Sequence, residues 1–270
     1  MGRVNKKTEV TVSPELISTD KICYEIGNLQ GIGARGRQED SFTAVNALDE
    51  QKSDKLGLLF AVCDGMGGMK DGKLASETAV QSFRASFAAM DRTGNISEQL
   101  KESVYVASEE VERLLGGDGG STVVIGIILN EKLHFASVGD SFFYLYRFGK
   151  LLRLNREHNI CHEMYRENIH RESTETEECR RADDAAALAQ FLGMPGISDI
   201  DCTVRPLNLR KGDVLVACSD GVGGVLTEEE IIESLQWPTA ADMCRRLEEH
   251  IAEHQNPNQD NYTVSIIKCN

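Results

Sequence analysis

The segment FAVCDGMGG at residues 60–68 has a close counterpart in VACSDGVGG at residues 216–224. Both contain an alanine, an Asp-Gly pair and a Gly-Gly pair at the same offsets. Each pattern predicts a buried strand that ends in a glycine-rich turn, because the apolar run stops at the aspartate. A strand end holds Asp64 or Asp220 rigidly, and the glycines let a metal or phosphate approach the backbone closely. Two copies indicate a shared site, with a purely structural repeat as the alternative.

Strand and helix patterns continue on both sides of these two segments. Apolar or alternating runs predict strands at residues 22–26, 56–63, 121–129, 133–139, 142–148, 213–219 and 262–269. Helical spacing and capping signals at Asn95 and Thr227 predict helices over residues 75–90, 96–114 and 240–254 and a short one after residue 227. Strand runs at both ends of the chain, with helix pairs between them, predict an α+β fold of two antiparallel sheets with helices outside.

Residues 155–198 interrupt this pattern of predicted strands and helices. The stretch is polar and charged, and its one helical pattern lies at Ala185–Leu192. We interpret it as a long mobile insertion into a single domain that covers residues 1–270, since no low-complexity linker divides the chain.

The composition is that of an acidic globular protein. The chain has 270 residues, of which 43 are acidic and 29 basic, and its formal net charge is −14. A field of this sign repels nucleic acids and anionic membranes, so we expect neither as a partner. No apolar run is long enough to cross a bilayer and the N-terminus lacks the apolar core of a signal peptide, which predicts a cytoplasmic protein. None of its eight cysteines forms a CxxC pair, which gives a thiolate zinc site no support, and without a secretory signal we expect them to be reduced. We also expect a monomer.

Further acidic residues stand at predicted junctions of strands and turns. They are Glu39-Asp40, Asp140 and Asp260-Asn261. Each alone is most simply an Asx turn or a solvated corner. If they converge with the two Asp-Gly turns, they form an all-oxygen site that suits Mg²⁺ or Mn²⁺. Zinc fits less well, because no His or Cys stands at ligand spacing among these segments.

Other potential metal ligands have simpler explanations. His250 and His254 lie four residues apart on a predicted helix, but the residues between them do not form the H-E-x-x-H pattern. We interpret both as solvated residues of a helix face. His158, Cys161 and His162 follow a predicted strand without an evident fourth ligand, and we interpret them as loop residues.

Taken in order, the motifs of the chain resemble those of the metal-dependent Ser/Thr protein phosphatases of the PP2C (PPM) family, particularly its compact bacterial members. The matching motifs are R-x-x-x-E-D (35–40), DGMGG (64–68), GSTVV (120–124), VGDS (138–141), SDG (219–221) and DN (260–261). Each is weak alone, but the ordered set spans nearly the whole chain and is highly specific. The resemblance implies a four-layer αββα sandwich, with two central antiparallel β-sheets flanked by helix pairs, and a flap at about residues 155–198.

The same resemblance implies a metal centre. Asp64 is expected to bridge two Mn²⁺ or Mg²⁺ ions, with Asp220 and Asp260 completing the protein ligands of the first. The backbone carbonyl of Gly65 is expected to bind the second ion. Asp140, together with Asp220, matches the position that holds a third and weaker ion.

Further residues surround this centre in the family. Glu39 and Asp40 are expected to act mostly through metal-bound water, and Asn261 to orient its neighbours by hydrogen bonding. Arg35 is expected to bind the substrate phosphate, a role that suits a planar fork of donors. Met66 stands where many eukaryotic members carry a histidine acid, so the leaving group must take its proton from water or another group.

The resemblance implies hydrolysis of phosphoserine and phosphothreonine in proteins by a metal-activated water. The implied partners are phosphoproteins and a cognate Ser/Thr kinase, and we expect the flap to contact the phosphoprotein. A catalytically silent binding module on the same fold is the first alternative, although none of the matched carboxylates is missing. A small-molecule phosphoesterase is the second, and a nuclease is disfavoured by the charge of −14.

Overall fold

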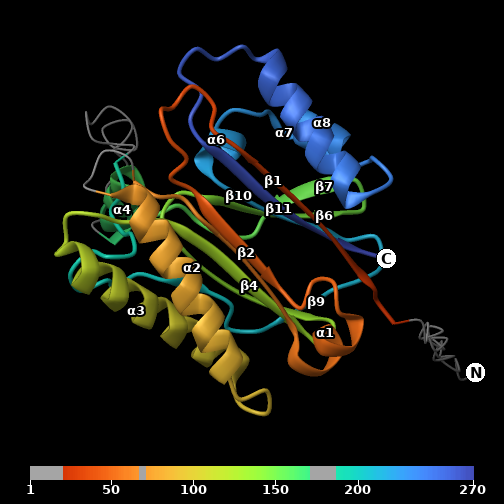
Figure 1. Cartoon of the computed structure of the whole chain (residues 1–270), viewed down its shortest axis with the longest axis horizontal. Helices are drawn as coiled ribbons and strands as arrows, with labels where there is room; N and C mark the ends of the chain where they lie inside the picture. The colour runs from red at the N-terminus through yellow and green to blue at the C-terminus, as the bar shows by residue number, and fades with distance from the viewer. Residues whose placement is uncertain (1–20, 67–70, 171–186) are drawn as a thin grey trace, which may run out of the picture.

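The structure is a computed structural model that describes residues 21–66, 71–170 and 187–270. Two antiparallel sheets stacked face to face form its centre (Figure 1). Sheet A has the strand order β1-β11-β10-β6-β7, and sheet B has the order β2-β3-β4-β5-β8, with β9 also paired to β5. Gly67 and Gly68 of the first glycine pair, and residues 185–186 of the predicted helical patch, lie outside the described residues.

The Asp-Gly turns follow interior strands of the two sheets. Sheet A consists of β1 (Tyr24–Gly31), β11 (Tyr262–Cys269), β10 (Val214–Cys218), β6 (Phe142–Arg147) and β7 (Lys150–Arg153). Sheet B consists of β2 (Ser41–Val45), β3 (Leu58–Cys63), β4 (Val123–Leu129), β5 (Lys132–Val138), β8 (Asp201–Cys202) and β9 (Leu207–Asn208). Strand β3 leads to the first turn and β10 to the second, and each has a paired neighbour on both sides.

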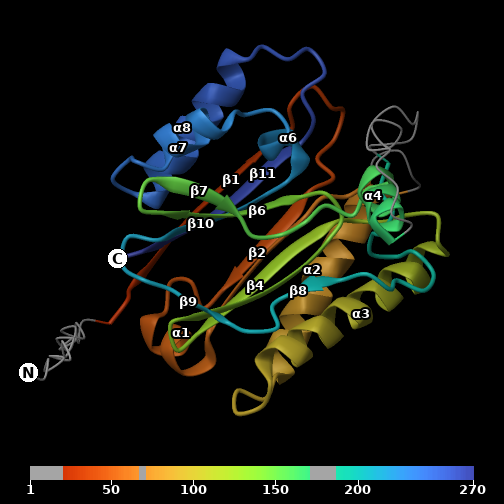
Figure 2. The same ribbon diagram turned by 180° about the vertical axis from the view of Figure 1, so that it is seen from behind.

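Helices cover the outer faces of both sheets, so that four layers are stacked (Figures 1 and 2). Over sheet B lie α2 (Gly72–Ala89) and α3 (Ile96–Leu115), and over sheet A lie α7 (Glu228–Ser234) and α8 (Ala240–Glu253). The expected α+β fold, a four-layer αββα sandwich, is confirmed. Shorter helices are α1 (Glu50–Leu56), α4 (Ile160–His170) and α6 (Asp220–Gly223). No helix in the described part of the chain is both long and apolar enough to span a bilayer.

Three apolar layers join these four layers of secondary structure. In β3, Leu59, Ala61 and Cys63 pack toward α2 and α3, whereas Leu58 and Phe60 point toward the other sheet. In β10, alternate side chains likewise pack between the sheets and toward α7 and α8. Burial on both faces explains why neither strand shows a polar alternation in its sequence.

Local side-chain signals set the starts of the helices. Asn95 accepts a hydrogen bond from Glu98 N at the start of α3, and Thr227 forms a complete capping box with Glu230 at the start of α7. The two capping signals read from the sequence are therefore confirmed. Helix α2 starts earlier than its apolar spacing indicates, because Asp71 caps it.

Two short helices carry no clear signal in the sequence. Helix α4 occupies part of the insertion that we expected to be irregular apart from Ala185–Leu192, and its sequence, ICHEMYRENIH, has few apolar side chains to show a helical period. Helix α1 follows Asp49, whose side chain accepts a hydrogen bond from Lys52 N, and is seven residues long. Short polar helices lack an apolar face long enough to be recognised.

The predicted helical patch at Ala185–Leu192 is wrong over its described part, residues 187–192. Leu188 instead forms an isolated β-bridge to Asn159, and Leu192 forms one to Ser121. Pairing with distant segments overrides the helical preference of the alanines and leucines, because propensity is a weak force beside tertiary contacts.

Candidate functional site

A cavity of about 210 Å³ opens where β3 and β10 end. It is lined by separate parts of the chain: Arg35, Glu39, Asp64, Gly65, Met66, Thr122, Asp140, Leu188, Asp220, Asp260 and Asn261. Eight of the nine candidate site residues read from the sequence are in this set. The ninth, Asp40, is fully buried and shares a hydrogen bond with the Asp64 carboxyl. The fold thus brings all nine candidates to one place.

Asp64 leaves β3 in an extended conformation that is held against the start of β4. Its N–H donates to Thr122 Oγ1 (3.2 Å), and its carbonyl accepts from Thr122 N (2.8 Å). A Cβ on Gly65 would lie 2.2 Å from Gly72 O and 2.5 Å from Glu39 O, so a side chain there would displace backbone. The Asp64 carboxylate is therefore fixed between β4, the first turn of α2 and the loop that carries Glu39.

Asp220 follows β10 in a different way, because it begins the single turn of α6. A Cβ on Gly221 would lie 2.0 Å from Asn261 O, so this glycine is also required by a close backbone approach. Directly before the aspartate, Ser219 Oγ donates to Asp40 Oδ2 (3.0 Å). The second turn is thereby joined to the segment before β11 and to the carboxylate at the start of β2.

Asp260 and Asn261 join the segment before β11 to the loop before β2. Arg35 Nη2 donates to Asp260 Oδ2 at 2.5 Å, and the Arg35 side chain is 52% exposed. Asn261 Oδ1 accepts from Glu39 N (2.7 Å), while its Nδ2 donates to two carbonyls of the same loop. One amide side chain thus holds the backbone that presents Glu39 and Arg35 to the cavity.

The crowded carboxyl groups of this cavity raise one another's pKa. Burial raises the pKa of Asp64 well above its usual value, and the charges of Asp40 and Asp220 raise it further. Burial raises the pKa of Asp40 to about 6 and that of Asp140 to about 6, and it also raises the pKa of Asp220. Such a cluster needs added positive charge before all its carboxylates can be ionised together at neutral pH.

The unpartnered oxygen atoms of the cluster indicate a cation as the source of that charge. Asp40 Oδ1 and Asp220 Oδ1 are buried and accept no hydrogen bond, whereas Glu39 Oε1 pairs with Arg37 (3.3 Å). Buried carboxylate oxygens cost free energy unless they are paired or coordinate a metal. Because every side-chain donor is oxygen, the site fits a hard cation such as Mg²⁺ or Mn²⁺.

The oxygen donors of the cavity do not surround a single ion position. Within the described residues, no three His, Cys, Asp or Glu side chains are arranged to hold one ion together. Arg35 forms an ion pair with Asp260, and the Asp64 carboxyl lies close to the carboxyls of Asp40 and Asp220. The carboxylates therefore face a guanidinium or one another, and side-chain rotation is needed to turn them toward a cation.

Two of the histidines set aside above, His250 and His158, are buried against protein partners. His250 is buried, and its ring lies between Glu233 (Nε2–Oε2 2.9 Å) and Glu253 (Nδ1–Oε2 3.1 Å). Our interpretation of His250 as a solvated residue is wrong, because its helix face packs against α7. His158 is also buried, and its Nδ1 contacts the backbone of Gly139 next to the cavity.

Two residues beside the site carry no functional signal in the sequence. Leu188, from the insertion, lines the cavity among the carboxylates. Lys73 Nζ donates to the carbonyl of Asp40 (2.8 Å) and to Ser41 Oγ (3.1 Å), so a positive charge lies next to the cluster. Single Leu and Lys residues are too common to mark a site, and only the folded chain shows what they touch.

Known proteins resemble the chain in both sequence and fold. A family model described as Protein phosphatase 2C matches residues 25–185, more than half of the chain. The serine/threonine phosphatase stp of Listeria innocua is 27% identical over 219 residues, which are 77% of this chain and 83% of that protein.

Solved structures with the same fold include two phosphatases. The PPM Ser-Thr phosphatase MsPP from Mycobacterium smegmatis, in complex with cacodylate, is 27% identical, with a TM-score of 0.70 over 92% of this chain and 98% of that one. The catalytic domain of the serine/threonine phosphatase PstP, in complex with 2 manganese ions, is 22% identical, with a TM-score of 0.71 over 92% and 99% of the two chains.

Proposed function

Because the chain belongs to the protein phosphatase 2C family, we propose that it hydrolyses phosphoserine and phosphothreonine in proteins at a centre of two Mn²⁺ or Mg²⁺ ions. Its curated relatives are serine/threonine phosphatases, and we assign it to the same enzyme class. The observation that carries the metal centre is the convergence of the nine candidate residues on one acidic cavity with unpartnered buried oxygens. We take residues 1–270 as one such domain.

The metal ligands in this proposal are side chains and one carbonyl that line the cavity. Asp64 would be a ligand shared by both ions, Asp220 and Asp260 would hold the first ion, the Gly65 carbonyl would hold the second, and Asp140 would serve a third and weaker ion; all of these residues line the cavity. Bound ions of this kind supply an activated water as the nucleophile and offset charge on the phosphoryl oxygens. The crowding that raises the carboxyl pKa values is relieved once positive charge lies between them.

Arg35 is the residue placed to bind the substrate phosphate. Its guanidinium lies at the exposed mouth of the cavity and pairs with Asp260. If Asp260 held a cation, this ion pair would be weaker and the fork of N–H donors would be available to phosphate oxygens. Asn261 keeps the Arg35 loop in position through its bonds to Glu39 N and two loop carbonyls.

Met66 sets a limit on how the leaving group is protonated. It lines the cavity and its thioether has no proton to donate. The leaving oxygen of the phosphoserine or phosphothreonine therefore takes its proton from water or from another group, and not from residue 66.

Hydrolysis of a phosphothreonine peptide tests the proposal directly. We expect turnover with Mn²⁺ or Mg²⁺, none with a chelator, and a loss of ~10³-fold or more in kcat for Asp220→Asn, the size seen when a main charge-stabilising group is removed. Asp118→Asn, in the turn after α3, is a matched control that should keep wild-type activity. Turnover in chelator, or full activity of Asp220→Asn, would refute the mechanism.

The insertion at 155–198 is proposed to act as a flap that contacts the phosphoprotein. Leu188 brings part of it into the cavity, and its bridge to Asn159 anchors that part. Replacing residues 171–186 by a short Gly/Ser link should lower activity on phosphoproteins more than on para-nitrophenyl phosphate. An equal loss on both substrates would contradict a role in substrate contact. We expect a Ser/Thr kinase to supply the phosphoproteins.

A further inference from the structure

We propose that the surface between α2 and β2 is a docking groove for an acidic segment of the phosphoprotein, an inference that rests on the proposed function. The groove, here called the α2 groove, consists of two hollows of about 520 and 670 Å³. The near hollow includes Ser41, Phe42 and Lys73, and the Lys73 ammonium pairs with Glu77 (3.5 Å) in the same hollow. The far hollow includes Val45 and residues at the end of α2. Arg84 lines both hollows, so they adjoin at its side chain.

The α2 groove begins beside the catalytic cavity. Strand β2 starts directly after Asp40, and Lys73 in the first turn of α2 donates to the Asp40 carbonyl. Farther along, Arg84 Nη1 approaches Thr43 Oγ1 (3.5 Å). Helix and strand therefore run side by side away from the metal site (Figure 1).

The length of the groove sets which part of a substrate reaches its far end. Lys73 and Arg84 are eleven residues apart on α2, which is ~16 Å at a helix rise of ~1.5 Å per residue. An extended peptide spans that distance with about five residues at ~3.3 Å each. A side chain about five to eight positions from the phosphorylated residue would therefore lie in the far hollow.

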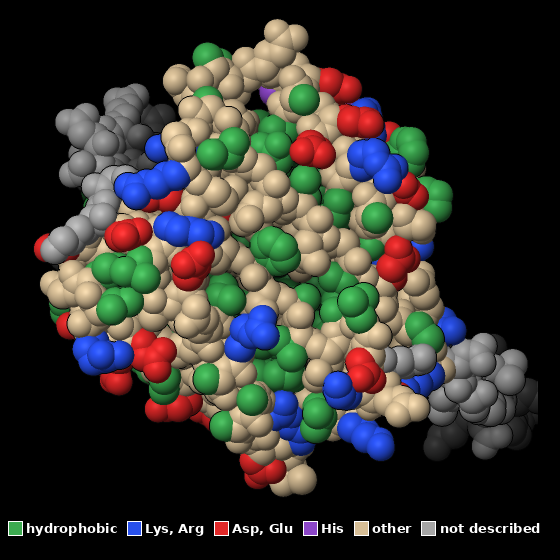
Figure 3. Space-filling model, viewed as in Figure 1, with side chains coloured by type: hydrophobic (Ala, Val, Ile, Leu, Met, Phe, Trp, Pro, Cys, Tyr) green, Lys and Arg blue, Asp and Glu red, His purple; other side chains and the backbone are tan. Residues whose placement is uncertain are grey.

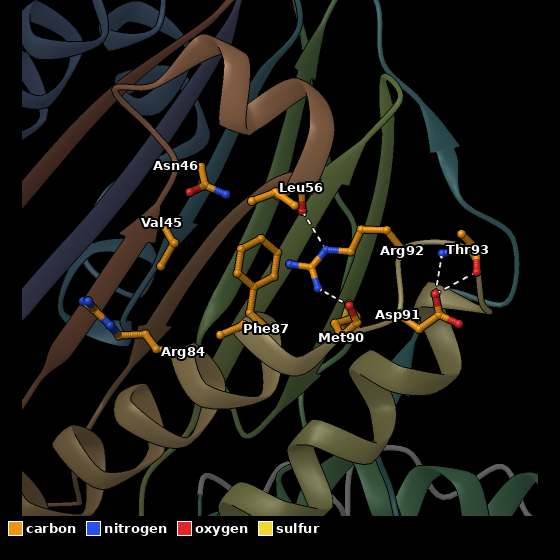
Figure 4. Close-up of a pocket in the computed structure, with 10 residues that line it drawn as sticks. Val45, Asn46, Leu56, Arg84, Phe87, Met90, Asp91, Arg92 and Thr93 are labelled. Atoms are coloured by element: carbon orange, nitrogen blue, oxygen red, sulfur yellow. Dashed lines mark hydrogen bonds between the residues drawn. The ribbon is translucent and has the colours of Figure 1, made fainter.

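The far hollow combines an apolar floor with guanidinium groups on its rim. Figure 4 shows Val45 at the end of β2, Leu56 at the end of α1, and Phe87 on α2 around one space, with Arg84 and Arg92 beside them. The Arg92 guanidinium is held in place, because Nε donates to Leu56 O (2.9 Å) and its carbon lies 4.4 Å from the centre of the Phe87 ring.

These guanidinium groups lack acidic partners of their own. In the described parts of the chain, Arg84 and Arg92 bond only to a hydroxyl or to backbone carbonyls, whereas Arg147 and Arg156 are paired with aspartates. The nearby Asp91 is occupied by its own turn, where it accepts from the backbone and hydroxyl of Thr93. The positive charge of the rim is therefore available to a ligand.

Charge complementarity selects the occupant. The chain carries a net charge of −14 and repels acidic peptides over most of its surface. On the face that carries α2 and β2, separate Lys and Arg side chains lie between apolar patches, with Asp and Glu side chains among them (Figure 3). A segment with a carboxylate beside an apolar side chain matches the rim and the floor together, because the ion pair fixes its register and the apolar contact adds affinity.

The test uses the full chain with Mn²⁺ and pairs of phosphothreonine peptides that differ at one position, Glu or Lys, placed five to eight residues from the phosphothreonine on either side. We expect a KM ~5–10-fold lower for the Glu peptide on one side, the range of an exposed ion pair with added contacts. Arg84→Glu should abolish this difference without changing kcat or turnover of para-nitrophenyl phosphate. Arg113→Glu, the same charge reversal on α3, should preserve it.

The outcomes separate the two proposals. Turnover of both peptides with equal KM in the wild type, or equal KM changes in Arg84→Glu and Arg113→Glu, would overturn the docking groove and leave the phosphatase activity intact. No turnover of either peptide or of para-nitrophenyl phosphate would contradict the proposed function itself. Rescue by Arg84→Lys would further support recognition by charge.

Discussion

After Asp64 the chain stays extended along the start of β4, whereas after Asp220 it turns at once into α6. Neither of the two glycines that follow has room for a side chain. A Cβ on Gly65 would clash with the first residue of α2, and a Cβ on Gly221 would clash with Asn261. The next residues also differ in their surroundings. Met66 lines the cavity, whereas a valine at position 222 is 1% exposed in the layer under α7 and α8.

The comparison shows that two similar strand-and-turn segments take different roles because different parts of the chain pack against them. The Asp64 turn joins the site to β4 and α2, and its carboxyl lies among those of Asp40 and Asp220. The Asp220 turn joins the site to the segment that carries Asp260 and Asn261. Each turn thus brings a different set of partners to the same cavity, which is why two similar segments form one unsymmetrical site.

The largest expected effect is the loss of activity when either aspartate is replaced, and the change in Tm in chelator distinguishes the two carboxylates. Asp64→Asn and Asp220→Asn should each lower kcat/KM on a phosphothreonine peptide by ~10³-fold or more, about 4 kcal/mol of transition-state stabilisation. In chelator, Asp64→Asn should raise Tm more than Asp220→Asn, because its carboxyl is the more strongly crowded. A lower Tm for Asp64→Asn than for the wild type in chelator would contradict this account of the crowding.

The glycines provide the next largest effect. Gly65→Ala and Gly221→Ala each place a methyl group within 2.2 Å of a backbone oxygen, so either change should lower the free energy of unfolding by ~2–4 kcal/mol. Gly36→Ala is the matched control, since a Cβ there meets no atom within 4 Å. Urea unfolding in chelator measures all three. A loss below ~1 kcal/mol at either turn would mean that its close approach is not required.

The stability of the metal-free protein should depend on pH, because carboxyl groups crowd the cavity. Asp40 and Asp140 have a pKa raised to about 6, so they favour the folded state at low pH and lose that contribution as pH rises through about 6. In chelator the loss is on the order of 2 kcal/mol between pH 5.5 and 7.5. Mn²⁺ neutralises the cluster, so the rise in Tm on adding Mn²⁺ should be larger at pH 7.5 than at pH 5.5. Equal rises at both pH values would argue against coordination by these carboxylates.

The smallest expected effect comes from the residue after Gly65. Met66→His places an imidazole at the cavity, and it should change kcat by about threefold and add a limb near neutral pH to the kcat profile, because a histidine can donate to the leaving oxygen. Met66→Leu is the control and should leave the shape of the profile unchanged. An unaltered profile in Met66→His would show that a side chain at this position does not reach the leaving group.

Much of the fold could be predicted because its signals are local. The strands β3 and β10 are apolar on both faces, and the capping residues Asn95 and Thr227 mark helix starts, so each element is readable from its own residues. The insertion was harder, since α4 is a short polar helix and the chain around Leu188 pairs with a distant segment. Pairing of that kind depends on contacts that no sequence window contains.

The sequence by itself determined the two Asp-Gly turns after buried strands, because an apolar run that stops at an aspartate and glycines is recognisable within a few residues. The ordered set of motifs that resembles the PP2C family supplied the other candidates for the site. Only the tertiary structure decided that Arg35 holds Asp260, that Leu188 enters the cavity, and that Arg84 and Arg92 border one groove. The physical reason is the distance along the chain over which each interaction acts. Backbone propensity and apolar period act over a few residues, whereas charge crowding and cavity shape depend on segments that folding brings together from opposite ends of the chain.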